Sequence, residues 1–261
     1  MSKPWGRTHL PGGFPTTLGQ PVGEVWFIGE DELPLLAKYL FTSDKLSVQV
    51  HPNDEQARSR GFANGKAECW LVIDAEPGAL IGLGLRYDIT PDKLRHAALN
   101  GSVEQLIAWR PVAAGDFFFV PPGTIHAIGA GISILELQQN SDVTYRLYDY
   151  GRGRDLHLEE AIAVAQCDRY PEHLYQRVSP ATNTVLVNGP HFTVVHSQGD
   201  ALQHQERLIL PIDGYAGIGD EIARPGECLL LRGHERLDSV EGCVLVAAAS
   251  SVEAVLLQTA A

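Results

Sequence analysis

Short hydrophobic runs separated by glycine and proline dominate the chain. The runs are rich in Val, Ile, Leu and aromatic residues, and 26 Gly and 16 Pro recur between them over 261 residues. Many short runs bounded by turn residues are typical of the strands of a β-sandwich or β-barrel. The pattern therefore predicts a mainly β protein.

A few segments interrupt this pattern with helical signals. Capping residues, helix-starting proline and helix-ending glycine mark them. Helices are expected over residues 31–41, where Pro34 falls in the first turn; from Asn53 or Asp54 to about Phe62; between Thr90-Pro91 and Asn100-Gly101; from a capping box at Ser102–Gln105 to near Trp109; and over His157–Gln166.

The sequence pattern changes near Tyr175, after which only strand and turn patterns follow. We therefore predict two parts, a catalytic domain over residues 1–175 with short helices and a smaller β module over 176–261. The second part has too few polar pairs at metal-ligand spacing to carry a site of its own.

Composition and charge restrict the class of protein. Hydrophobic residues make up 44% and charged residues 20%, as in ordinary globular proteins. No apolar run is as long as a membrane span, and no secretory signal is expected at the N-terminus. The four cysteines form no C-x-x-C pair, which fits a reducing cytoplasm. The formal charge of −12 argues against broad nucleic-acid binding and means that an anionic substrate needs a local basic cluster.

The stretch KLSVQVHPND, Lys45 to Asp54, alternates polar and apolar residues in a predicted strand. Successive side chains of a strand point to opposite faces, so Ser47, Gln49 and His51 share one face. We expect this polar face to point into a pocket rather than to water.

Two other stretches supply side chains of similar chemistry. In GDFFFVPPGTIHAIG a strand enters a Pro-Pro-Gly turn and His126 follows it, and in GKAECWLVI the side chains of Lys66, Glu68 and Trp70 share a face. Two imidazoles and a carboxylate suit Zn²⁺, and Mn²⁺, Fe²⁺, Co²⁺ or Ni²⁺ would also accept them. Gln49 would be a weaker, neutral fourth ligand.

Each feature also has a plainer interpretation. His51 before Pro52 is compatible with a turn residue, Lys66 and Glu68 with an exposed ion pair, and His126 with a cap after a glycine turn. The occurrence of all of them at predicted strand ends favours a metal site.

These motifs resemble a known superfamily. The pattern G-x5-P-x-G-x-x-H from Gly115 to His126 resembles the second conserved motif of the cupins, with Ala130 at the usual asparagine. The first cupin motif is altered to Gln49-x-His51 with Glu68 further on. That alteration is similar to the type I mannose-6-phosphate isomerases, particularly their short bacterial form. The segments KPWG, GKAECW and ILELQQNSDVTYRLYDYGR also match, so the resemblance covers residues 1 to about 170.

The resemblance implies a double cupin of jelly-roll type with a few peripheral helices and a degenerate second cupin. It implies an isomerase of carbohydrate metabolism that interconverts mannose 6-phosphate and fructose 6-phosphate through a cis-enediol or enediolate, with one divalent ion. The implied metal ligands are Gln49, His51, Glu68 and His126; the implied catalytic residues are Lys38, Glu136, Asp142 and Arg146; and the implied substrate-binding residues are Ser47, Lys66 and Arg152.

Roles within this set stay open at the level of sequence. Lys38 acts as a base if burial and nearby cations lower its pKa. Glu136 is either a second candidate base or a buried acid paired with Arg146. Arg146 itself is expected to stabilise the enediolate. Asp142 assists ring opening, and Arg152 stands where long members carry a phosphate-binding lysine.

Two departures from the long members affect the site. Ile128 replaces a tyrosine, and a large helical insertion is missing, so another element must cover the site. The competing hypotheses are a metal-dependent oxygenase on the same scaffold and a non-catalytic sugar-phosphate-binding bicupin. In each case we expect a small-molecule partner, with no nucleic acid and no membrane; the oligomeric state is left open.

Overall fold

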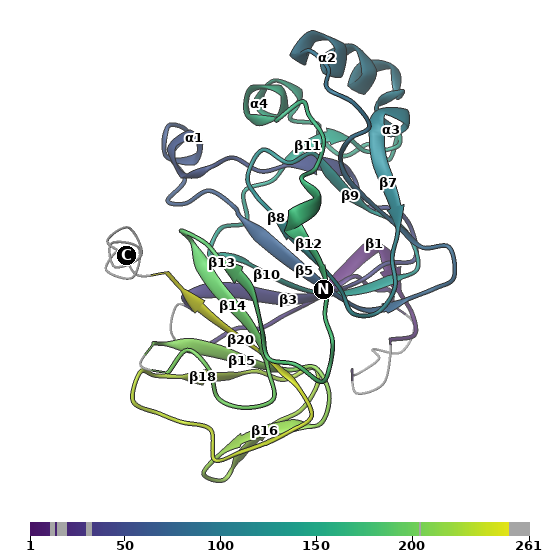
Figure 1. Cartoon of the computed structure of the whole chain (residues 1–261). Helices are drawn as coiled ribbons and strands as arrows, with labels where there is room; N and C mark the ends of the chain where they lie inside the picture. The colour runs from purple at the N-terminus through teal and green to yellow at the C-terminus, as the bar shows by residue number, and fades with distance from the viewer. Residues whose placement is uncertain (11–13, 15–19, 30–32, 204, 251–261) are drawn as a thin grey trace.

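The computed structural model describes residues 1–10, 14, 20–29, 33–203 and 205–250. Antiparallel sheets are the main regular structure of this part of the chain, and the helices gather at one end (Figure 1). The prediction of a mainly β protein with a few peripheral helices is confirmed.

Two sheets make up the first part of the chain. The six-stranded sheet has the order β12 (Tyr175–Arg177), β8 (Asp116–Val120), β5 (Glu68–Ala75), β10 (Ile132–Gln139), β3 (Leu35–Phe41) and β2 (Glu24–Trp26). The five-stranded sheet has the order β11 (Tyr145–Tyr148), β4 (Val48–Val50), β9 (His126–Ile128), β6 (Leu80–Leu85) and β7 (Ile107–Pro111). The N-terminal strand β1 (Ser2–Arg7) contacts β2 and β3.

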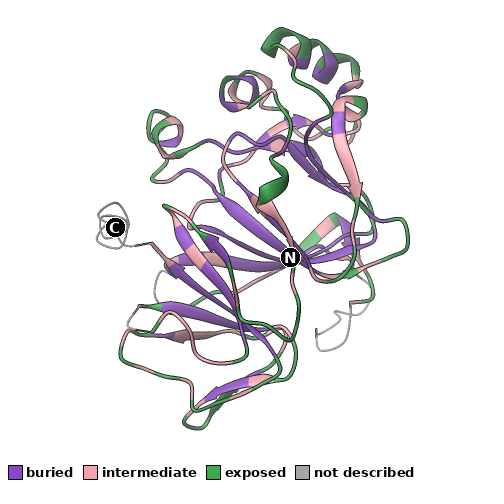
Figure 2. Ribbon diagram, viewed as in Figure 1, coloured by how far each residue is buried: buried purple, intermediate pink, exposed green. Residues whose placement is uncertain are grey.

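Each sheet is covered on both faces. The inner faces of the two sheets share an apolar cluster that contains Leu40 and Trp70 from one sheet and Ile81 and Ile128 from the other. The outer face of the five-stranded sheet packs against the helices, and the outer face of the six-stranded sheet packs against the second part of the chain. Figure 2 shows this as buried ribbon along the central strands and exposed ribbon on the outer helix faces.

The second part of the chain is built from two smaller sheets. One has the order β13 (Thr184–Asn188), β14 (Phe192–Ser197), β20 (Val244–Ala249), β15 (Arg207–Pro211) and β18 (Leu229–Leu231); the other has β17 (Glu221–Ala223), β16 (Tyr215–Ile218) and β19 (Ser239–Glu241). Leu35 and Tyr39 of β3 share a core cluster with Val194 and Leu208 of this part. The division into domains 1–175 and 176–261 stays a prediction, and residues 251–261 lie outside the described part.

The helices are short. They are α1 (Asp54–Arg58), α2 (Pro91–Asn100), α3 (Val103–Leu106) and α4 (Leu158–Val164), with a 3₁₀ turn at Glu172–Leu174. The predicted caps of two of them are confirmed: Asn53 forms a capping box with Gln56, and the Thr90 side chain accepts from the backbone N–H of Lys93. Within the described residues, none of the helices combines the length and apolar character needed to cross a membrane.

Two helix predictions are wrong. Residues 35–41 form strand β3, and positions 31–32 lie outside the described residues. Both faces of β3 are buried, so the segment shows no polar alternation, and a short apolar run of this kind does not distinguish strand from helix. Helix α3 ends at Leu106 rather than near Trp109, because β7 pairs with β6; Ser102 makes no side-chain cap.

Candidate active site

Three strands bring the predicted metal ligands together. His51 directly follows β4, Glu68 begins β5 and His126 begins β9. Gln49 lies opposite His126 in the β4–β9 register. The backbone N–H of Gly123 donates to the carbonyl of His51 at 2.8 Å, which ties the two histidine segments together. Gly123 has φ of 86°, a conformation that glycine adopts without strain.

The two imidazoles and the carboxylate face one another. His51 Nε2 lies 3.4 Å from Glu68 Oε2, and His126 Nε2 lies 3.4 Å from Glu68 Oε1. The opposite ring nitrogen of each histidine lies 2.9 Å from a backbone carbonyl, that of Val143 or Thr124. A carbonyl only accepts, so each Nδ1 carries the proton and each Nε2 presents its lone pair to Glu68.

This arrangement fits a divalent metal ion. Both Nε2 atoms and both Glu68 oxygens are buried and make no hydrogen bond to the described residues, which is costly unless another group binds them. Burial lowers the pKa of both imidazoles, that of His51 to about 3, so both are in the neutral, ligating form. Burial opposes ionisation of Glu68, but the Lys66 ammonium group outweighs burial and holds the pKa of Glu68 well below its usual range.

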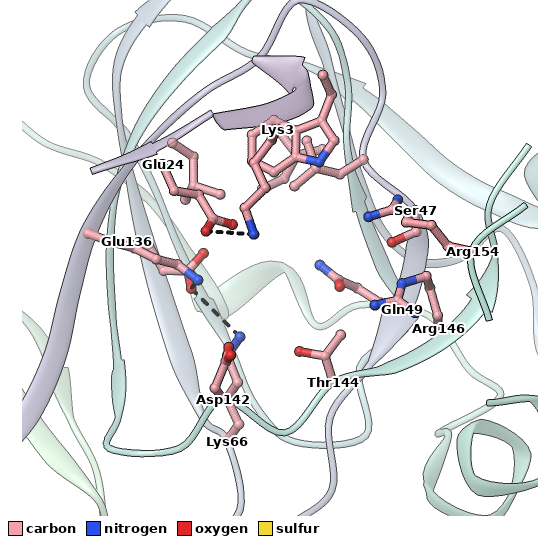
Figure 3. Close-up of a pocket in the computed structure, with 15 residues that line it drawn as sticks. Lys3, Glu24, Ser47, Gln49, Lys66, Glu136, Asp142, Thr144, Arg146 and Arg154 are labelled. Carbon is pink, nitrogen blue, oxygen red and sulfur yellow. Dashed lines mark ion pairs between the residues drawn. The ribbon is translucent and has the colours of Figure 1, made fainter. Parts of the chain in front are cut away.

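A polar cavity of about 210 Å³ lies beside these residues between the two sheets. Figure 3 shows Glu24 and Glu136 on one side of it and Ser47, Gln49, Arg146 and Arg154 on the other. The polar face of the stretch from Lys45 to Asp54 therefore points into a pocket, as expected.

Comparison with known proteins identifies the family. The chain is 37% identical over 237 residues to the mannose-6-phosphate isomerase ManA of Bacillus subtilis, covering 82% of this chain and 75% of that protein. It is 42% identical over 196 residues to the mannose-6-phosphate isomerase of Streptococcus mutans, covering 71% of this chain and 62% of that protein. The chain belongs to the mannose-6-phosphate isomerase family. No protein-family profile matches it.

Solved structures agree with this membership. The crystal structure of the mannose 6-phosphate isomerase of Bacillus subtilis superposes with a TM-score of 0.68 at 29% identity, over 84% of this chain and 76% of that one. A mannose 6-phosphate isomerase bound with zinc and yttrium superposes with a TM-score of 0.71 over 96% of this chain and 97% of that one; at 15% identity it supports the fold alone. The predicted cupin fold class is confirmed.

Lysine ammonium groups and glutamate carboxylates alternate along the side of the cavity that the six-stranded sheet forms. Lys38 on β3 lies opposite Glu136 on β10 in the register, and their charged groups are 2.9 Å apart. Lys66 Nζ lies 3.8 Å from Glu136 and 3.1 Å from Glu68. The structure pairs Glu136 with lysines, so the alternative of an ion pair with Arg146 is wrong.

The pKa of Lys38 shifts against expectation. Burial favours the neutral amine, but the carboxylates of Glu136 and Glu24 outweigh burial and raise the pKa above its ordinary value. The condition under which Lys38 would act as the base, a lowered pKa, is therefore not met. Burial raises the pKa of Glu136, even against the attraction of Lys38.

Other predicted residues lie on the rim or the five-stranded side. Ser47, Asp142 and Arg146 line the cavity, but Arg152 is absent from its lining. Ile128 also lines it, at the position of the missing tyrosine. Sequence reasoning missed several lining residues, namely Lys3, Trp5, Glu24, Thr144 and Arg154. Lys3 and Trp5 belong to the segment KPWG, whose match to the family was the one available signal for them.

The N-terminal strand covers part of the site. Lys3 and Trp5 reach the cavity from β1, and Lys3 Nζ lies 3.0 Å from Glu24 Oε2. Strand β1 thus meets the expectation that another element covers the site in the absence of the helical insertion.

Proposed function

We propose that this protein interconverts mannose 6-phosphate and fructose 6-phosphate, using one divalent ion, zinc, held by His51, Glu68, His126 and Gln49. The observation that carries the proposal is the convergence of buried ligand atoms that make no hydrogen bond to the described residues, beside a cavity lined by cations, in a member of this family. We also propose that the protein works in the reducing cytoplasm, because all four of its cysteines are free of disulfide bonds.

Such an isomerase moves one proton between C1 and C2 through a cis-enediol or enediolate. A divalent ion bound beside these carbons would polarise the carbonyl as a Lewis acid. We assign the proton transfer to the Glu136–Lys38 pair. Glu136 is the base, since burial raises its pKa toward the range useful in catalysis, and Lys38 holds it in place from 2.9 Å.

The remaining residues bind and orient the sugar. Lys66 lies between Glu136 and Glu68, where its ammonium group reaches a substrate hydroxyl beside the metal ligands. We assign Arg146 to binding of the anionic substrate from the five-stranded side of the cavity, in place of the enediolate role expected from sequence. Asp142 is exposed at the cavity wall, where it assists ring opening.

The decisive experiment follows conversion of mannose 6-phosphate to fructose 6-phosphate by the purified protein, together with metal analysis of the untreated sample. We expect conversion that a chelator abolishes and that stoichiometric Zn²⁺ restores. No chelator-sensitive conversion would refute the proposal, and O₂ consumption or binding without turnover would favour an oxygenase or a binding protein. Restoration by Fe²⁺ or Mn²⁺ but not Zn²⁺ would refute the assignment of zinc alone.

A further inference from the structure

Two arginines two residues apart lie near the same end of the cavity but have different surroundings. They stand in the segment Gly151-Arg152-Gly153-Arg154 after strand β11. Gly151 and Gly153 have φ of 75° and 74°. Such residues reverse the local direction of the chain, so the two side chains leave it differently. Arg154 lines the cavity and Arg152 does not.

The guanidinium of Arg152 is fully engaged by the protein. Its Nη1 donates to the carbonyl of Lys45 at 2.7 Å, its Nε to the carbonyl of Asp149 and its Nη2 to the Asp149 carboxylate. All three nitrogens therefore have protein acceptors. These contacts fasten the loop to the beginning of β4 but leave little donor capacity for a substrate.

The guanidinium of Arg154 keeps donors available. Its Nε and Nη2 both bond the Asp149 carboxylate, and its Nη1 makes no hydrogen bond to the described residues. Asp149 is only 3% exposed, and the two arginines outweigh its burial and lower its pKa, so it is a charged, fixed acceptor. Asp149 thus holds the Arg154 fork in one orientation, while Nη1 keeps its donors available beside the cavity that Arg154 lines.

Arg146 completes this side of the cavity. Its Nη1 donates to the carbonyl of Asp155, and its other guanidinium nitrogens make no hydrogen bond to the part of the chain described. Arg146 and Arg154 line the same cavity, and burial followed by the Arg154 guanidinium lowers the pKa of Arg146. A multivalent anion between them would relieve this repulsion.

Charge decides which side of the cavity takes the phosphate. On the six-stranded side, Lys3, Lys38 and Lys66 each lie within 3.1 Å of a glutamate carboxylate. The three lysine charges and the three glutamate charges therefore nearly cancel. On the other side Asp149 is the buried carboxylate and pairs with Arg152 and Arg154, while Asp44, which Arg152 also contacts, and Asp142 are exposed to solvent. The excess positive charge therefore lies beside the start of β4, where Ser47 lines the cavity.

We propose that Arg154, held by Asp149, is the phosphate anchor of this enzyme together with Arg146 and Ser47, and that Arg152 instead fixes the loop. The proposal rests on the isomerase function proposed above. It reverses the expectation from sequence that Arg152 contacts phosphate.

The test compares Arg154→Gln, Arg152→Gln and the exposed-site control Arg86→Gln in the metal-loaded protein. Two constants are measured: the KM for mannose 6-phosphate, and the dissociation constant of inorganic phosphate by calorimetry. We expect Arg154→Gln to raise both constants by roughly 10- to 100-fold, because the loss of a hydrogen bond between charged groups weakens binding by about that factor. Arg152→Gln should change each by less than about 3-fold, within the range of the Arg86→Gln control.

Equal or larger losses in Arg152→Gln, or an Arg154→Gln variant within about 3-fold of the parent, would overturn the assignment. If Arg154→Gln fails to fold, Arg154→Lys decides: it keeps the charge but cannot bridge Asp149 and phosphate with one planar fork, so phosphate binding should still weaken about 10-fold. Phosphate binding needs no turnover, so an inactive parent protein would count against the isomerase and not against the anchor.

Asp149 is a positioning residue in this scheme. Asp149→Asn should raise the KM for mannose 6-phosphate while kcat stays within about 2-fold, because the reacting carbons lie away from the arginines. A loss of kcat with unchanged KM would show that Asp149 acts on the chemistry or the fold instead.

Discussion

Replacing Lys38 by methionine tests whether the buried charge pair of the cavity is as tightly coupled as the structure indicates. Lys38 and Glu136 are 5% and 3% exposed, and their charged groups are 2.9 Å apart. Methionine keeps most of the side-chain length but leaves Glu136 with Lys66 at 3.8 Å as its remaining cation. Breaking one partner of a buried pair costs about 3–5 kcal/mol. Since Lys66 compensates in part, we expect a loss of about 3 kcal/mol.

The loss of stability in Lys38→Met should depend on pH. The folded-state pKa of Lys38 is raised, so Lys38 stays charged at all pH values below its ordinary pKa, and its own titration causes no change in stability between pH 5 and 9. Glu136 has a raised pKa and binds its proton more tightly in the folded state, so its contribution falls as pH rises. Loss of Lys38 raises the pKa of Glu136 further, because Lys38 lowers it in the parent. The deficit of Lys38→Met should therefore be smaller at pH 5 than at pH 8.

The assay is reversible chemical denaturation at fixed metal concentration, since a bound ion itself adds stability. A loss of about 3 kcal/mol corresponds to a fall of about 6–12 °C in Tm for a chain of this size. The double variant Lys38→Met/Glu136→Gln removes the uncompensated charge and should recover at least half of the loss. A single variant within about 0.5 kcal/mol of the parent at pH 8, or a double variant no more stable than the single, would refute the coupling.

Three further predictions concern the metal site and the fold. Glu68→Ala should lose bound metal and activity while far-UV circular dichroism stays unchanged; full metal content by elemental analysis would contradict the ligand assignment. The matched control His191→Ala should keep the parent rate within about 2-fold, because His191 makes one partly exposed contact of 3.7 Å with Asp54. Asn53→Ala removes the side-chain acceptor of the capping box but keeps the backbone N–H that donates to Gln56, and it should lower the free energy of unfolding by about 1 kcal/mol, with an unchanged midpoint in urea as the contrary result.

Sequence patterns predicted the metal site better than the elements that carry it. His51, Glu68 and His126 come from separate strands, and each strand end was marked locally by a proline, a glycine turn or alternation. Lys38 was placed in a helix and lies on β3. The reason is that β3 packs one face inside the cavity sandwich and the other against the second part of the chain. A strand buried on both faces carries no periodic signal.

Pairings across strands were beyond local patterns. The partner of Glu136 depends on the β10–β3 register, which is set by packing over the whole sheet, and the sequence offered Arg146 instead of Lys38. The choice between Arg152 and Arg154 depends on the backbone at Gly151 and Gly153. Motif position specified a cation near the phosphate but not which of two neighbouring guanidiniums keeps free donors.

The cavity explains how a chain with a formal charge of −12 can hold a doubly charged substrate. Strand β4 runs from the arginine side toward the metal site, and its polar face carries Ser47 and Gln49, with His51 following. His51 lies four residue steps beyond Ser47 in extended chain, a span of roughly 13 Å. The phosphate and the reacting carbons of one sugar would therefore be bound by the two ends of a single strand face, with the arginines at one end and Glu68 at the other. Since the intervening lysines are matched by glutamates, the field along the cavity favours one orientation of the substrate and disfavours its reversal.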